Sequence, residues 1–271
     1  MKKVLLLLLI LIIGCTNETI KETPDLEKIP EPTLPVDKKV VSNEMPVPRH
    51  DVPEMIVEHE GEDDSMDTFE KCPNPLILET PVDLKKVVSI LYPGQVRGGD
   101  YKPHGGFRFD NSDNKISVKM PMDGFLSRGA RYIENGELQY MFEFMNPCGI
   151  SFRFDHFTVL SPKLEKIAMA LPEAKVDDSR TVDLVHEKFV LGEEIASEIG
   201  QPNNVFVDLG VYDMRQKNEA SKTSELVKDY PSEIASYAVC WLNWLSPENS
   251  AIVNGLPAAD GKSGKKSEYC K

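Results

Sequence analysis

The sequence has almost no long apolar runs, and this limits how the chain could meet a membrane. The one uninterrupted run covers residues 4–13, which is too short to cross a bilayer and remain there. Two lysines precede the run, and Gly14 and Cys15 follow it. A charged head, an apolar middle and a small-residue exit are typical of a secretory signal, so we predict that residues 1–14 are a signal peptide.

A basic patch is also missing, which argues against nucleic-acid binding. The chain carries 31 Lys and Arg against 44 Asp and Glu, for a formal net charge of −13. Binding to nucleic acid requires clustered cations that neutralise phosphates. The acidity is concentrated in residues 18–70, where sixteen acidic and five basic residues give −11. The rest of the chain is therefore close to neutral.

Residues 15–70 show no apolar periodicity, and the part from residue 18 onward contains seven prolines. A Pro-rich chain with self-repelling charge stays extended, so we predict a linker that carries a domain away from its attachment point. Its acidic run EHEGEDDSMD lacks the glycine and the ligand spacing of an EF-hand loop. We interpret this run as solvated charge and not as a calcium site.

Cysteines are few, and no two of them stand at the C-x-x-C spacing that is common in zinc sites. Apart from Cys15, the chain has Cys72, Cys148, Cys240 and Cys270. An even number of cysteines in an exported protein indicates disulfides. Four cysteines allow three pairings, and the sequence does not choose among them. We favour Cys72 with Cys148 and Cys240 with Cys270.

Residues 71–271 are long enough for one domain with a hydrophobic core. Several segments between residues 87 and 160 alternate apolar and polar residues and are separated by Gly, Pro or Asn-Ser, and two more follow at residues 188–200 and 203–215. This pattern predicts strands, and we expect a mainly β fold, an antiparallel sheet or sandwich, over residues 71–217.

Helical spacing appears in two places. In residues 161–173, the apolar residues Leu164, Ile167, Ala168 and Leu171 share one face, so we predict a helical insertion near residues 161–185. In residues 231–245, three- and four-residue spacing predicts a helix within a helical C-terminal extension that covers residues 218–271. Trp241 and Trp244 lie on its apolar stripe, so we predict that they are core residues and not a sugar-stacking surface.

The motif IIGC at residues 12–15 resembles the bacterial lipobox. The resemblance implies cleavage before Cys15 and lipidation of its sulfur, which would anchor the chain to a membrane without a spanning helix. The chain would then be an exported lipoprotein that faces the periplasm or the cell exterior. A plain signal peptide, or an uncleaved anchor with an incidental cysteine, is the alternative.

Four segments between residues 92 and 215 resemble, in order, the motifs of the lysostaphin-like, LytM-type peptidases of family M23, which carry a duplicated hybrid motif. HGGFR matches H-x-G-x-D, SVKMPMDGFL resembles the following strand, FRFDHF resembles Y-x-H-L, and VLGEEIASEIG with VFVDLGVYD resembles the last motifs. The resemblance implies a LytM-like β domain and a cell-envelope role. Members of this family cleave peptidoglycan peptides with zinc.

The residues that carry the chemistry match this family only in part. His104 stands at the first ligand position and His156 at the Y-x-H-L histidine, which handles the nucleophilic water. Arg108 stands where the family has a ligating aspartate, and Phe206 and Asp208 replace the two histidines of the last motif. Arginine has no lone pair for a metal. We therefore expect no cofactor, and we predict an ion pair between Arg108 and Asp208 in the groove.

Strand alternation supports this placement. It puts His104, Arg108 and Asp110 on one face of their strand, Phe154 with His156 on one face of the next, and Phe206 with Asp208 on one face of the last. Phe107 and Phe109 would then face the core. The two glycines of HGGFR would permit close backbone approach beside the groove.

Three functions remain open. The preferred one is a non-catalytic lipoprotein, a pseudoenzyme whose groove binds peptidoglycan or an envelope protein and regulates wall hydrolases. The second is a zinc-dependent endopeptidase with a shifted ligand set, in which His104, Asp110 and Asp208 hold the metal and His156 positions water. The third is a structural envelope module whose groove is filled by the C-terminal helix.

Overall fold

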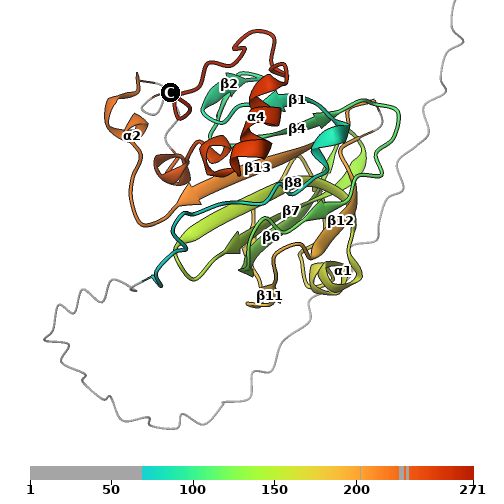
Figure 1. Cartoon of the computed structure of the whole chain (residues 1–271). Helices are drawn as coiled ribbons and strands as arrows, with labels where there is room; N and C mark the ends of the chain where they lie inside the picture. The colour runs from blue at the N-terminus through green and yellow to red at the C-terminus, as the bar shows by residue number, and fades with distance from the viewer. Residues whose placement is uncertain (1–68, 202, 226–228, 230–231) are drawn as a thin grey trace, which may run out of the picture. The chain divides into compact units, whose positions relative to one another are not determined.

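The computed structural model describes residues 69–201, 203–225, 229 and 232–271. These residues confirm the predicted mainly β fold. Eleven of the described strands form one mixed sheet. Its central path runs, in spatial order, through β1 (Val87–Leu91), β4 (Gly105–Phe109), β13 (Phe206–Asp213), β8 (Ile150–Leu160), β7 (Glu137–Met145), β6 (Gly124–Glu134) and β10 (Val182–Asp183) (Figure 1).

Shorter strands complete the sheet at its margins. β12 (Glu194–Ile199) pairs with β8 and with β5 (Val118–Lys119), while β6 also pairs with β9 (Lys175–Val176) and β11 (Lys188–Phe189). The hairpin of β2 (Gln95–Arg97) and β3 (Asp100–Lys102) forms a separate two-stranded sheet. Between β6 and β7, Asn135 and Gly136 both have positive φ, which matches the right-handed twist of a tight hairpin.

Phenylalanine dominates the core that the sheet covers. Rings on β7, β8 and β11 are fully buried and packed against one another: Phe142, Phe144, Phe152, Phe154, Phe157 and Phe189. Phe107 of β4 is fully buried as well and packs against Trp241. Phe109 is buried as well, so the prediction that Phe107 and Phe109 face the core is confirmed. Each buried ring contributes about 2–3 kcal/mol of transfer free energy, and this burial fixes where the strands lie.

Strand β8 changes its neighbour partway along its length. Up to Asp155 it pairs with β13, and from Phe157 onward it pairs with β12. Its register with β7 shifts between the Phe154 and Phe157 pairs, so the strand has a bulge there. His156 lies in the bulge with a φ of 70°. Phe154 and Phe157 both face the core although they are three positions apart, because the bulge inserts one extra residue.

Helix α1 (Pro162–Ala168) begins where the sequence predicted a helix. The Ser161 side chain accepts a hydrogen bond from the Leu164 backbone N–H, and Pro162 occupies the first turn. Leu164 and Ala168 are buried under the helix. Residues 169–185, which we expected to continue a helical insertion, contain no helix and instead supply the short strands β9 and β10. The helical insertion is therefore limited to α1.

The helix predicted over residues 231–245 is wrong as a continuous element. The described part forms two 3-10 helices, η2 (Ile234–Tyr237) and η3 (Trp241–Trp244), separated by extended backbone at Ala238. There the chain bonds to β13, with the Val239 N–H donating to the Val211 carbonyl. Trp241 lies in the core against Phe107, and Trp244 packs on the core while partly buried. Pairing with the end of β13 has thus replaced helical hydrogen bonds.

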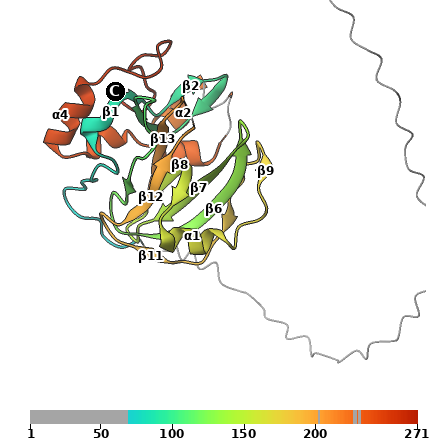
Figure 2. The same ribbon diagram turned by 90° about the vertical axis from the view of Figure 1, so that its right-hand side faces the viewer.

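The remaining C-terminal residues pack on the β1 and β4 side of the sheet. Helix α4 (Pro247–Gly255) contacts η3 and the 3-10 helix η1 (Leu84–Lys86), and Ala258 forms a bridge with Ile90 of β1. Helix α2 (Ala220–Thr223) contacts η2. Figure 2 shows α4 next to β1, well separated from α1 at the β11 and β12 end.

Two disulfides join the favoured cysteine pairs. Cys72 is bonded to Cys148, and Cys240 to Cys270. Both bonds are consistent with an exported protein in an oxidising compartment. Within the described ranges, no helix is long and apolar enough to cross a membrane. The predicted signal peptide, the predicted lipidation site Cys15 and nearly all of the predicted linker lie outside the described residues.

Candidate functional site

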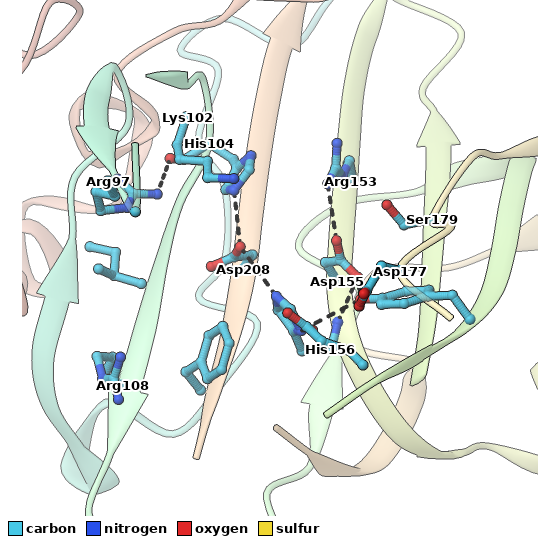
Figure 3. A pocket seen from close by; sticks show the side chains of 15 residues that line it. Arg97, Lys102, His104, Arg108, Arg153, Asp155, His156, Asp177, Ser179 and Asp208 are labelled. Atoms are coloured by element: carbon cyan, nitrogen blue, oxygen red, sulfur yellow. Dashed lines mark hydrogen bonds and ion pairs between the residues drawn. The ribbon is translucent and has the colours of Figure 1, made fainter. Parts of the chain in front are cut away.

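A cavity of about 560 Å³ opens beside the strands that carry the predicted site residues. Strands β4, β6, β8 and β13 supply its floor, and the β2–β3 hairpin and the segment after β9 supply its rim. It is lined by Leu91, Arg97, Gly98, Lys102, His104, Arg108, Tyr132, Glu134, Arg153, Asp155, His156, Asp177, Ser179, Phe206 and Asp208 (Figure 3). We call it the site pocket. Its volume suits a small-molecule ligand or a short chain segment.

His104 and Asp208 are in direct contact at the centre of this pocket. His104 Nε2 lies 2.9 Å from Asp208 Oδ2, so the imidazole donates its Nε2–H to the carboxylate (Figure 3). Burial lowers the pKa of His104, and Asp208 only partly opposes this effect, so the ring is neutral at physiological pH. His104 is therefore a hydrogen-bond donor whose position Asp208 fixes.

Gly106 makes this contact geometrically feasible. It lies opposite Asp208 in the β4–β13 pairing. A Cβ at this position would lie 2.4 Å from the Val207 carbonyl oxygen and 3.1 Å from Asp208 Oδ1. At Gly105, a Cβ would lie 2.2 Å from the Leu91 carbonyl oxygen. The prediction that both glycines permit close backbone approach beside the groove is confirmed.

His156 is surrounded by acceptors. Its Nδ1 lies 2.6 Å from Gln139 Oε1 and 3.3 Å from Glu134 Oε2, while its Nε2 lies 3.6 Å from Asp208 Oδ2. Its backbone N–H donates to Asp155 Oδ1 at 2.9 Å. The imidazole therefore has acidic or amide oxygens at both ring nitrogens.

These acceptors keep His156 charged. Burial alone lowers the pKa of His156, but Asp155, Asp208 and Glu134 outweigh burial and raise it to about 10. For Asp208 the effects have the opposite signs. Burial raises the pKa of this carboxyl, yet His104 and His156 hold it well below its usual range. An imidazolium and a carboxylate thus face each other at neutral pH, and His156 has no lone pair with which to accept a proton.

A second charge-paired group lies beside the first. Arg153 Nη2 donates to Asp155 Oδ2 at 3.0 Å, and the Tyr132 hydroxyl donates to Asp155 Oδ1 at 2.6 Å. Burial raises the pKa of Asp155. The cations His156 and Arg153 and the Tyr132 hydrogen bond have the larger, opposite effect, so the pKa of Asp155 is below its ordinary value. The strand bulge is what allows Asp155 and His156, although adjacent in sequence, to line the same pocket.

The expected alternation along β8 is therefore wrong at one point. We predicted that Phe154 and His156 share a face. The structure places Phe154 in the core and His156 in the site pocket, with Arg153 and Asp155 also on the pocket side. Alternation fails because the bulge shifts every later residue by one. On β13, Phe206 and Asp208 line the pocket together, as predicted.

The predicted ion pair between Arg108 and Asp208 is not formed. Arg108 Nη2 donates to Asn204 Oδ1, and its guanidinium lies 5.4 Å from the centre of the Phe206 ring. In the β4–β13 pairing, Arg108 lies opposite Phe206, whereas Asp208 lies opposite Gly106. The two side chains share a face but are offset by two residues along the strands, and His104 lies nearer to the carboxylate.

The shifted zinc ligand set is not assembled either. Asp110 is exposed, does not line the pocket and accepts hydrogen bonds from Ser112. Among the described residues, no group of three or more His, Cys, Asp or Glu side chains is arranged to hold a metal ion. The two donors that stand at zinc-ligand positions in the family resemblance are instead bonded to each other, because His104 directs its N–H at Asp208. His156, at the position that would handle water, is an imidazolium. These residues do not fit the zinc site of family M23.

Several pocket residues were not foreseen from the sequence, above all Tyr132, Glu134, Arg153 and Asp155. They lie on strands whose solvent-side charges look ordinary when each strand is considered alone. One signal was present: in FRFDHF, the buried phenylalanines change from two-residue to three-residue spacing, which is the pattern of a bulge.

Comparison with protein-family models, curated proteins and solved structures found no match to this chain. The resemblance to family M23 therefore rests on the four sequence motifs alone.

Proposed function

We propose that this chain is an exported cell-envelope module whose site pocket binds a ligand and does not cleave it. Peptidoglycan is the ligand that the motif resemblance favours, and an envelope protein is the alternative. Anchoring through a lipidated Cys15 belongs to the same proposal and rests on the sequence. The two disulfides and the acidic, Pro-rich linker support a domain held outside the cell.

One observation carries the binding role: the potential catalytic side chains are paired with one another. His104 Nε2 lies 2.9 Å from Asp208 Oδ2, and the charged His156 is held by the same carboxylate and by Glu134. A hydrolase of this kind needs a metal-bound water or a general base with a free lone pair. The charged His156 has no lone pair, and the lone pair of the neutral His104, on Nδ1, is buried away from solvent without a hydrogen-bond partner among the described residues. Fixed, paired charges around an open cavity are instead suited to orienting a polar ligand.

The test is co-sedimentation of the purified chain with isolated peptidoglycan sacculi. Ser179 lines the pocket and is exposed, so Ser179→Trp should fill part of the cavity without removing a core contact. We expect the wild-type chain to sediment with sacculi and the variant to remain largely in solution. Release of soluble muropeptides should stay at the level of untreated sacculi.

Ala251→Trp is the matched control, since Ala251 is exposed on α4 and does not line the pocket. It should bind sacculi as the wild type does. Equal binding by Ser179→Trp and the wild type would place the binding surface elsewhere. Failure of the wild type to sediment would contradict peptidoglycan as the ligand, and muropeptide release would contradict the non-catalytic role.

A further inference from the structure

Arg108 differs from the other cations that line the site pocket in how its charge is used. Arg153 is paired with Asp155 at 3.0 Å, and His156 is surrounded by carboxylates. Lys102, on the rim, lies 3.4 Å from Asp100. In the described part of the chain, no ion pair within 4.0 Å includes Arg108. Its charge lacks an internal counterion.

Arg97 also lacks a carboxylate within that distance, but its donors are already in use. Its Nη1 donates to the Tyr92 carbonyl at 2.6 Å, and its Nη2 donates to the His104 carbonyl at 2.9 Å. Arg97 therefore holds the loop that carries His104. Arg108, by contrast, has one recorded hydrogen bond, from Nη2 to the Asn204 side chain. A guanidinium has five N–H donors in a planar fork, so most of those of Arg108 are available to a ligand.

Two contacts hold this guanidinium in place. The Asn204 amide oxygen accepts one N–H, and the Phe206 ring lies under the guanidinium carbon at 5.4 Å. The other neighbour of Phe206 is the His156 ring, whose centroid is 4.2 Å from that of Phe206. Phe206 thus interacts with two cations, which orders the Arg108 side chain before any ligand arrives. An ordered fork loses less conformational entropy on binding.

The carboxylates that line the pocket do not pair with Arg108. Asp155 faces the cation Arg153, Asp208 faces the charged His156, and Glu134 also contacts His156. Asp177 is exposed after β9 and forms no ion pair within 4.0 Å with any other described residue. In Figure 3, Arg108 and Asp177 lie on opposite sides of Asp208 and His156. The pocket is therefore polarised, with an uncompensated cation on one wall and an uncompensated acid on the other.

We propose that Arg108 is the recognition residue for a carboxylate on the ligand of the site pocket, held by the planar fork above Phe206. This proposal rests on the ligand-binding function proposed above and names the chemical group that the pocket selects. The carboxylate could come from a peptide C-terminus or from an acidic sugar, and the two sources share the same bidentate chemistry.

The experiment is calorimetric titration of the full chain with matched acid and neutral probes. N-acetyl-alanyl-alanine and its C-terminal amide test a peptide carboxylate, while glucuronic acid and glucose test a sugar carboxylate. We expect at least one acid to bind about tenfold more tightly than its neutral partner, because one charge-assisted hydrogen bond increases affinity by about that factor. Arg108→Gln should abolish that preference, and Arg108→Lys should retain part of it. Asp177→Asn should modestly strengthen acid binding by removing repulsion.

Arg128→Gln is the matched control, because Arg128 is a half-exposed arginine on β6 that does not line the pocket. It should leave the acid preference unchanged, and melting temperatures should show that each variant folds. Equal binding of acid and neutral probes, a preference that survives in Arg108→Gln, or binding of none of the acids would overturn the proposal. If Arg108→Gln still sediments with sacculi in a Ser179-dependent manner, the pocket function stands and the role of Arg108 falls.

Discussion

The two faces of strand β8 are stabilised in different ways, one by buried aromatic rings and the other by ion pairs. On the core side, Phe152, Phe154 and Phe157 are fully buried among other aromatic rings. On the pocket side, Arg153 and His156 are held by carboxylates in a connected network. The apolar side stabilises the fold through area removed from water, which tolerates small shifts. The charged side depends on every partner being present, since removal of one leaves another buried charge unpaired.

The largest expected loss of stability is on the core side. Phe154→Ala removes a fully buried ring that packs on Phe157 and Phe144, and it should lower the free energy of unfolding by about 4 kcal/mol. Denaturant unfolding with intact disulfides measures this. The pKa of His156 should stay near its wild-type value. A loss below about 1 kcal/mol would show that the core closes around the gap.

A substitution on the pocket side should lower the free energy of unfolding nearly as much, because it removes a buried charge. Asp208→Asn keeps the shape of the side chain but removes the anion that faces His104 and His156. We expect a loss of about 3 kcal/mol and a fall in the pKa of His156, because its cation loses a buried partner. Unfolding together with an NMR titration of the imidazole measures both. An unchanged His156 pKa would show that the network is not coupled.

Close packing between β4 and β13 should give a smaller loss. Gly106→Ala places a methyl group against the Val207 carbonyl and should destabilise by about 2 kcal/mol, because two paired strands must separate locally. Gly255→Ala, which meets nothing within 4 Å at the end of α4, should change stability by less than about 0.5 kcal/mol. Equal effects of the two substitutions would contradict the close contact at Gly106.

The smallest effect, counted per pH unit, is the pH dependence of stability. The folded-state pKa of His156 is raised to about 10, above its ordinary value of 6.5. Its contribution to stability is therefore full below pH 6.5, declines above that, and is lost as pH rises through 10, by at most about 1.4 kcal/mol per pH unit. His156→Gln should flatten this slope. A stability difference between the two chains that stays constant from pH 6.5 to 10 would contradict the charged imidazole.

More of the fold than of the site could be predicted from the sequence. Alternation located the long strands, since Gly124–Glu134 and Ile150–Leu160 each show buried and polar positions in turn. The motif resemblance placed His104, His156 and Asp208 in one groove, and all three line the site pocket. The partner of each side chain could not be predicted in the same way. Whether Asp208 pairs with Arg108 or with His104 depends on an offset of two residues between β4 and β13, which alternation does not determine.

The C-terminal error has a similar origin. Residues 234–245 have helical apolar spacing, but the Val239 N–H bonds to β13 and Cys240 is bonded to Cys270. A tertiary backbone contact outweighed local periodicity there. The β8 bulge is the opposite case, because the changed spacing of Phe154 and Phe157 was visible in the sequence before the structure explained it.

The replacement of metal coordination by mutual pairing can be tested by elemental mass spectrometry of the purified chain. The wild type and His104→Ala would be dialysed in parallel and their metal content measured. If Asp208 is paired with His104 and His156 and not with a metal ion, neither protein should carry stoichiometric zinc. Stoichiometric zinc in the wild type that is lost in His104→Ala would contradict this arrangement and would turn attention to metal-dependent hydrolysis of peptidoglycan.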